Sequence, residues 1–230
     1  MNRFTTVLWD VDNTLLDFAY SQRISLAECF RSIGREMTEE ELALYARIND
    51  DYWKRLERGE VTKEQLLTGR FLLLFEKLGI EGVDVDGFGA RYQEGLGSHY
   101  SFLDDSLAIC ESLRGKVKQY VITNGVTSTQ RKKLELSGLW DVMDGIFISE
   151  EIGASKPDPA FFRAVFGAMG LEDLRRVLMV GDNLLADVKG GLDAGVDAVW
   201  YNPRRLPPQG EIVPTYDLGS FQELEALILE

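Results

Sequence analysis

From residue 104 onward, short apolar segments alternate with segments of helical periodicity, and this alternation constrains the fold more than any other feature. Apolar runs typical of buried strands occur at Val117–Ile122, Gly145–Ile148, Val177–Val180 and Val196–Tyr201. Helical patterns separate them, so each strand returns to the sheet through a right-handed crossover, which makes neighbouring strands parallel. The sequence therefore predicts an α/β fold with a Rossmann-like, doubly wound parallel sheet covered by helices on both faces.

The first predicted strand lies far from the others in the sequence and ends on two aspartates. Thr6–Trp9 is apolar, and Asp10 and Asp12 follow at its carboxyl end. Side chains alternate along an extended segment, so residues two positions apart point to the same side. Two close carboxylates repel each other unless a metal ion or a proton lies between them. A turn rich in Asp and Asn is the alternative explanation of this stretch.

Only helical patterns follow this strand until the alternation begins. Thr38 and Thr62 each stand three residues before a Glu or Gln, the capping-box spacing that opens a helix. Such a block of consecutive helices predicts a helical bundle inserted into the sheet domain. We therefore expect an inserted helical domain at residues 16–99 and a core formed by residues 1–15 and 100–230.

Composition argues against several kinds of partner. The formal net charge of -13 disfavours binding to nucleic acid or to an anionic membrane. No apolar run approaches the ~20 residues needed to cross a bilayer, and the first residues lack a signal-peptide pattern. The two cysteines, Cys29 and Cys110, lie in amphipathic helical patterns, which favours buried thiols over a disulfide. We expect a cytoplasmic protein that binds neither nucleic acid nor membrane, as a monomer or a homodimer.

Three further polar clusters follow the ends of predicted strands. Thr123-Asn124-Gly125 offers a hydroxyl group and backbone amides that suit a phosphate oxygen. Lys156 stands in a proline-rich loop stiff enough to hold a positive charge in place for phosphate. Asp182 and Asp187 are oxygen ligands of the kind that Mg²⁺ prefers. Alone, each cluster also has an ordinary explanation, as a turn, a solvated lysine or a pair of surface acids.

Together and in this order, the four signals closely resemble the motifs of the haloacid dehalogenase superfamily of phosphotransferases. Those motifs are D-x-D-x-T, a terminal Ser or Thr, a Lys, and G-D-x-x-x-x-D. They match Asp10–Thr14, Thr123, Lys156 and Gly181–Asp187. The resemblance covers nearly the whole chain, because the helical insertion matches the C1-type cap domain of that superfamily.

The resemblance implies a Mg²⁺-dependent phosphomonoester hydrolase that works through an aspartyl-phosphate intermediate. It implies that Asp10 is the nucleophile and Asp12 the general acid and base. The superfamily's dehalogenases lack an acid two residues after the nucleophile, so Asp12 argues against carbon–halogen chemistry. The implied Mg²⁺ ligands are Asp10, the backbone carbonyl of Asp12, and Asp182. Asp187 would orient a metal-bound water or Lys156 from outside the ligand set. The residues implied to bind the substrate phosphate are Thr123, Asn124 and the catalytic Lys156.

Longer segments resemble one branch of the superfamily, the YjjG-type pyrimidine 5′-nucleotidases. These segments are Leu15–Phe18, Trp53–Arg70, Ile122–Gly125 and Ile148–Pro157. The resemblance implies that the small-molecule substrate is a pyrimidine nucleoside or deoxynucleoside monophosphate. Two alternatives stay open: a phosphomutase or sugar-phosphate phosphatase of the same superfamily, and a non-catalytic module that is phosphorylated on aspartate.

Overall fold

The computed structural model describes residues 3–171, 173–208 and 210–230, and the chain divides into two compact units. One unit contains Met1–Phe18 and Tyr100–Glu230, and the other contains Ala19–His99. The domain bounds expected from the sequence, with an insertion at residues 16–99 between 1–15 and 100–230, stay a prediction.

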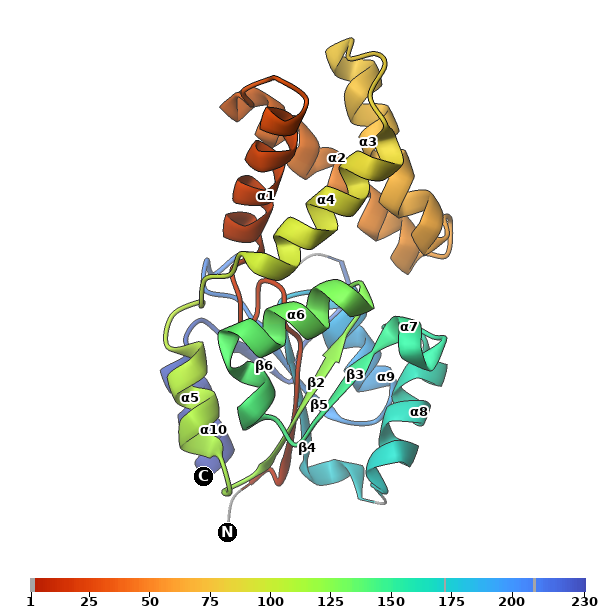
Figure 1. Ribbon diagram of the computed structural model, residues 1–230. Coiled ribbons are helices and arrows are strands. Elements are labelled where there is room, and N and C mark those ends of the chain that lie inside the picture. Colours follow the sequence, from red (N-terminus) through yellow and green to blue (C-terminus); the bar gives the residue numbers. More distant parts are fainter. Residues whose placement is uncertain (1–2, 172, 209) are drawn as a thin grey trace. The chain divides into compact units, whose positions relative to one another are not determined.

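The first unit contains a six-stranded parallel sheet in the order β3-β2-β1-β4-β5-β6 (Figure 1). Its strands are β1 Thr6–Trp9, β2 Lys118–Thr123, β3 Gly145–Ile148, β4 Val177–Gly181, β5 Asp197–Tyr201 and β6 Tyr216–Leu218. The chain adds β2 and β3 on one side of β1 and then returns to add β4, β5 and β6 on the other side. The predicted α/β class and doubly wound parallel sheet are confirmed.

The direction of strand order reverses between β1 and β4, and this position determines where a ligand site is expected. Sheets of this type bind ligands outside the carboxyl ends of the strands at such a reversal. Trp9 pairs in register with Val180, so the residues that follow the two strands leave the sheet at the same level. Asp10 and Asp182 both belong to these exits.

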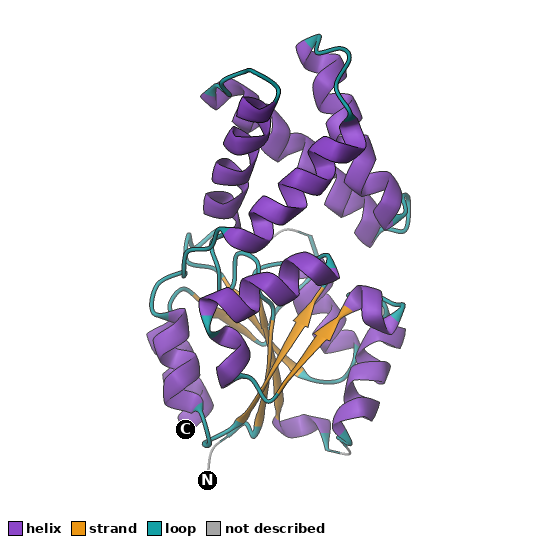
Figure 2. Ribbon diagram, in the orientation of Figure 1, coloured by secondary structure: helices purple, strands orange, loops and turns teal. Residues whose placement is uncertain are grey.

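Helices cover both faces of the sheet, as Figure 2 shows. Val7 and Trp9 of β1 belong to an apolar core with residues of α5, α6 and α10, whereas Leu8 belongs to a second core with residues of α8 and η3. This alternation follows from the period of two along a strand. The helices of this unit are α5 Ser106–Leu113, α6 Thr127–Ser137, η1 Leu139–Val142, α7 Ser149–Ile152, α8 Pro159–Met169, η2 Leu174–Arg176, η3 Leu184–Lys189, α9 Gly190–Asp193 and α10 Phe221–Leu229.

The second unit is built from α1 Phe18–Ser32, α2 Glu39–Glu57, α3 Lys63–Leu78 and α4 Val85–Ser98, except that Phe18, the first residue of α1, belongs to the first unit. The predicted capping boxes are confirmed, because the hydroxyls of Thr38 and Thr62 accept hydrogen bonds from backbone N–H groups three residues later. Aromatic rings fill the interior of the bundle: the Phe71 ring stacks on Tyr45 with 5.4 Å between centroids and meets Tyr92 edge to face with 5.3 Å between centroids.

Two predictions from composition can be compared directly with the structure. Cys29 and Cys110 are both buried and unpaired, as expected. Within the described ranges, every helix is too short or too polar to span a bilayer.

Candidate active site

Lys156 lies at the centre of a buried polar cluster beyond the ends of β1, β2 and β4. Its side chain is 2% exposed, and Nζ donates to Asp10 Oδ1 at 2.8 Å, Asp187 Oδ1 at 2.7 Å and the Ile122 carbonyl at 2.8 Å. An ammonium group has three N–H donors, so these three bonds use all of them. The alternative explanation of a solvated lysine is wrong. Instead, the Lys156 ammonium contacts the first and the last of the four predicted motif segments, at Asp10 and Asp187, and the end of β2.

Asn124 fixes the backbone of Lys156. Its side-chain Nδ2 donates to the Lys156 carbonyl at 2.8 Å, and its Oδ1 accepts the Lys156 N–H at 2.9 Å. One amide side chain thus satisfies both backbone groups of the lysine. These two bonds hold the loop after β2 against the loop that carries the lysine.

Asp10 is held on both carboxylate oxygens. Oδ1 accepts from Lys156, and Oδ2 accepts from the Thr14 hydroxyl at 3.3 Å. The same Thr14 oxygen accepts the backbone N–H of Asp182 at 3.1 Å, and the Asp10 N–H donates to Val180 at 2.9 Å. These bonds tie the end of β1 to the end of β4 at the point where strand order reverses.

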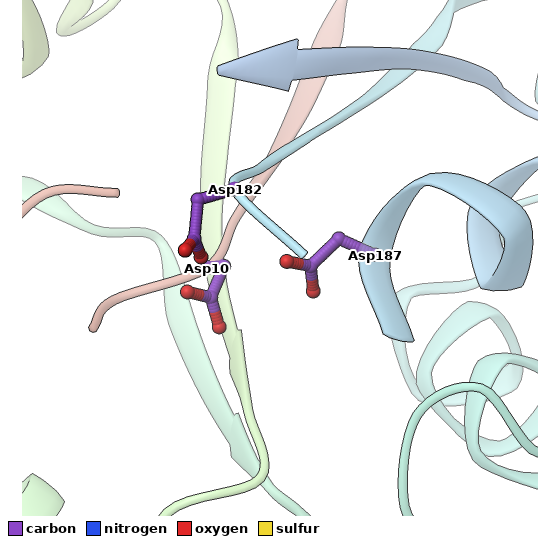
Figure 3. Close-up of side chains that lie close together, drawn as sticks. All are labelled: Asp10, Asp182 and Asp187. Carbon is purple, nitrogen blue, oxygen red and sulfur yellow. The ribbon is translucent and has the colours of Figure 1, made fainter. Parts of the chain in front are cut away.

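Three carboxylates meet beside this lysine. Asp10, Asp182 and Asp187 each offer one oxygen atom within 4.8 Å of the others, and Figure 3 shows the three side chains close together, with Asp187 pointing toward the other two. Asp10 and Asp187 are buried, and Asp182 is half-buried. Three hard oxygen donors at this separation fit a divalent cation such as Mg²⁺, and a single ammonium cannot neutralise three carboxylates.

The pKa values of these groups reflect the balance between burial and charge. Burial raises the pKa of Asp10 from 3.8 to about 7, although the Lys156 ammonium lowers it. Burial also raises the pKa of Asp182 well above its usual value, and the charges of Asp10 and Asp187 add to that rise. Burial alone would lower the pKa of Lys156, but the two carboxylates that it contacts outweigh burial and raise it. The lysine is therefore charged at neutral pH, whereas Asp10 and Asp182 favour a proton or a cation.

Thr123 ends β2 and is 2% exposed. Its hydroxyl oxygen accepts the Gly125 N–H at 3.1 Å, so the O–H proton of the threonine is left to donate to another group. Gly125 has a steric reason to be glycine, because a Cβ there would lie 2.2 Å from Gln130 Nε2. The tight turn after β2 therefore places a hydroxyl donor beside a stretch of backbone that passes close to the Gln130 side chain.

The side chain of Asp12 contacts α6 and not the lysine. Lys133 Nζ donates to Asp12 Oδ1 at 2.6 Å, and Gln130 Nε2 donates to Asp12 Oδ2 at 2.5 Å. Neither donor was predicted from the sequence. The available signal is their helical spacing: Gln130, Lys133 and Ser137 share the buried stripe with Leu134, where apolar residues are usual.

Asp187 lies on η3, where the sequence predicts an ordinary helix and the structure has a π-helical turn. The Asn183 side-chain oxygen caps this turn by accepting the N–H groups of Leu185 at 2.9 Å and Ala186 at 3.0 Å. A Cβ on Gly181 would lie 2.2 Å from Asp187 Oδ2, so the glycine lets the carboxylate approach the end of β4. Turns of this type are frequent at functional sites.

The predicted site residues thus lie in one region of the core unit. Lys156 contacts Asp10 and Asp187 directly, and backbone or hydroxyl bonds join Asp182 and Asn124 to this group. Asp12 follows β1 and its side chain is bonded to α6, whereas Thr123 ends β2 and its side chain is bonded to the turn after that strand. The chemical role of each residue stays a prediction.

Comparisons with known proteins bear on the same question. Residues 4–195 match the family model of haloacid dehalogenase-like hydrolases. The chain is 33% identical to pyrimidine 5′-nucleotidase PynA of Streptococcus pneumoniae, over 95% of this chain and 92% of that protein. It is 32% identical to pyrimidine 5′-nucleotidase YjjG of Escherichia coli, over 96% of each.

A solved structure extends this similarity to three dimensions. The crystal structure of YfnB from Bacillus subtilis, which is bound to magnesium and reveals interdomain movement, matches with a TM-score of 0.93 at 33% identity. The match covers 98% of this chain and 99% of that one. By its sequence motifs, its fold and these relatives, the chain belongs to the haloacid dehalogenase-like hydrolases.

Proposed function

We propose that the protein is a Mg²⁺-dependent phosphomonoester hydrolase that acts on pyrimidine nucleoside and deoxynucleoside monophosphates through an aspartyl-phosphate intermediate. The observation that carries this proposal is the convergence on Lys156, whose ammonium contacts Asp10, Asp187 and the end of β2. The substrate class is supported by the relatives PynA and YjjG, which are named pyrimidine 5′-nucleotidases and align over almost the whole chain.

Asp10 is the nucleophile of the proposed reaction. One of its carboxylate oxygens attacks phosphorus in line, while the bond between phosphorus and the nucleoside oxygen breaks. Hydrogen bonds from Lys156 and Thr14 fix the orientation of this carboxylate before attack. Holding a nucleophile in the reactive geometry removes a large entropic part of the barrier.

The residues that would hold Mg²⁺ are Asp10, the backbone carbonyl of Asp12, and Asp182. The close approach of the Asp10 and Asp182 carboxylates supports this assignment, as does the magnesium bound by the relative YfnB. When bound, the cation supplies positive charge that neutralises the phosphate oxygens. Asp187 contacts Lys156 at 2.7 Å, which supports its role in orienting the lysine from outside the ligand set.

The substrate phosphate is bound by the Thr123 hydroxyl, the Asn124 backbone amide and the Lys156 ammonium. Such fixed donors stabilise negative charge in the transition state without reorganisation. All three donors of Lys156 are engaged within the protein, so a phosphate oxygen replaces one of these partners. The Asn124 side chain keeps the lysine backbone in place during that exchange.

Asp12 transfers the protons. Its carboxyl group gives a proton to the leaving nucleoside oxygen as the first bond breaks. The resulting carboxylate then takes a proton from the water that attacks phosphorus, which releases inorganic phosphate and restores Asp10. Asp12 is followed within two residues by Thr14, so both proton transfer and nucleophile support come from the segment after β1.

The setting of this activity is proposed from composition and cysteine state. Two buried, unpaired thiols support a reducing cytoplasm. A net charge of -13 supports a small-molecule substrate over nucleic acid or membrane. We propose a monomer or a homodimer.

The test is the release of inorganic phosphate from UMP, dUMP, dTMP and a set of sugar phosphates, with MgCl₂ or with a chelator. We expect Mg²⁺-dependent release from the pyrimidine nucleotides, loss of all release in Asp10→Asn, and normal release in Asp50→Asn, which changes an exposed acid paired with Lys54. Isomerisation of a sugar phosphate without free phosphate would instead identify a phosphomutase. Rapid release from sugar phosphates but not nucleotides would reject the nucleotide assignment alone.

A further inference from the structure

Both carboxylate oxygens of Asp12 are occupied by donors from a single helix. Lys133 and Gln130 lie one turn apart on α6, and each donates to a different oxygen, at 2.6 Å and 2.5 Å. A carboxylate held at both oxygens has one orientation left. The carboxylate of Asp12, the second acid after β1, is therefore oriented by α6.

Burial makes these contacts costly to break. The Lys133 side chain is 1% exposed, whereas that of Asp12 is 27% exposed. Removing the partner of a buried charge leaves an uncompensated ion, which is strongly unfavourable. The Phe18 ring, whose centroid lies 5.8 Å from Lys133 Nζ, adds a second favourable contact for the ammonium. The lysine is consequently fixed, and Asp12 is the member of the pair that opens toward solvent.

Gln130 binds Asp12 through only one of the two polar atoms of its side chain. Its side chain is buried, and in the described part of the chain its Oε1 has no hydrogen-bond partner, while its Nε2 serves Asp12. Gly125 provides the space for this amide, since any larger residue there would collide with Nε2. A buried acceptor left without a partner costs free energy, and such local costs are typical of functional sites.

We infer that Lys133 and Gln130 are positioning residues that hold the Asp12 carboxylate for proton transfer, an inference that rests on the proposed function. Each carboxylate oxygen has two lone pairs. The two donors from α6 occupy one lone pair on each oxygen, so one on each stays available to carry the proton that goes to the leaving oxygen and later to take a proton from water. The two residues act through Asp12 and do not themselves contact the reacting atoms.

If Lys133 and Gln130 have this role, the effect of replacing them depends on the leaving group of the substrate. Phosphoryl transfer to Asp10 from an alkyl ester such as UMP needs a proton on the leaving oxygen, whereas p-nitrophenolate leaves as a stable anion. Loss of Asp12 positioning therefore lowers kcat/KM for UMP more than for p-nitrophenyl phosphate. A general change in folding or in the amount of active protein lowers both values equally and leaves their ratio unchanged.

The experiment measures the ratio of kcat/KM for UMP to that for p-nitrophenyl phosphate in Lys133→Met, Gln130→Met and Asp12→Asn. Lys118→Met is the matched control, because Lys118 also pairs with an aspartate at 2.6 Å but at the other end of β2. We expect the ratio to fall about tenfold or more in each α6 variant, given the 10²–10⁴-fold worth of general acid catalysis. We expect no change in Lys118→Met and partial recovery in Lys133→Arg.

A double variant separates positioning from any independent effect. Combining Lys133→Met with Asp12→Asn should lower the ratio no further than Asp12→Asn alone, because both changes remove one interaction. An unchanged ratio in an α6 variant, with wild-type protein active on both esters, would overturn the positioning role and leave the proposed function intact. Failure of the wild type to hydrolyse either ester would overturn the proposed function itself. Should Lys133→Met not fold, Gln130→Met decides the question.

Discussion

At the scale of single residues, Asp10 has surroundings that oppose its negative charge until a cation is present. Burial raises its pKa to about 7, and the neighbouring acid Asp187 adds to the rise while Lys156 opposes it. A proton and a divalent cation therefore compete for the same oxygens near neutral pH. Metal binding to carboxylates releases protons wherever such competition exists.

The first prediction follows from this competition. Below the raised pKa of Asp10 the protonated form prevails, so Mg²⁺ must displace a proton, and above it Mg²⁺ binds without that cost. The apparent affinity for Mg²⁺ should therefore increase as pH rises from about 6 to about 8, by up to about tenfold per pH unit where one proton is displaced. Calorimetric titration at several pH values measures it. In Asp10→Asn this dependence should weaken, and equal slopes in both proteins would contradict the assignment.

A second prediction concerns the clamp that Asn124 forms on Lys156. Asn124→Ala removes the two hydrogen bonds to the lysine backbone, at 2.8 Å and 2.9 Å. We expect the free energy of unfolding to fall by about 2 kcal/mol, since backbone groups there lose their partners. Because Lys156 is then less well fixed, kcat/KM for a nucleotide should fall as well. Urea denaturation and steady-state kinetics measure the two effects. Unchanged values of both would show that the clamp is dispensable.

At the scale of secondary structure, local rules predict most elements of this chain. The capping boxes at Thr38 and Thr62 and the Pro159 that begins α8 mark helix starts where the structure has them. These signals act over three or four residues, so no tertiary information is needed to interpret them. The π-helical form of η3 is different. No local pattern in the sequence marks it, and in the structure the Asp187 carboxylate of this turn packs against Gly181.

The third prediction tests that packing. Gly181→Ala places a methyl group 2.2 Å from Asp187 Oδ2, so the acid must move and the contact with Lys156 should weaken. We expect a loss of about 1–3 kcal/mol in unfolding free energy, typical of overpacking, and a large loss of activity. Gly167→Ala on α8 is the control, because its methyl group meets no atom within 4 Å. That variant should gain about 0.5–1 kcal/mol from helix propensity. Equal behaviour of the two variants would contradict the steric account.

At the scale of the whole molecule, the convergence of Asp10, Thr123 and Asp182 was predictable because parallel strands bring their carboxyl ends to one edge. Lys156 differs, because α7 separates it from β3 and the loop after this helix brings the lysine to the same edge. The contacts of Asp12 were not predictable. They depend on the rotation of α6 about its axis, which places Gln130 and Lys133 toward β1. That rotation is set by packing across the sheet, so a single sequence contains no direct signal for it beyond polar residues on a buried stripe.

The central claim is that these converging segments transfer a phosphoryl group to Asp10. The most direct measurement is mass spectrometry of protein mixed with UMP and Mg²⁺ and quenched in acid within a single turnover. We expect one phosphoryl group on the peptide that contains Asp10, present in wild type and absent in Asp10→Asn. Turnover of UMP with no phosphorylated peptide, or with the phosphoryl group on another residue, would contradict it.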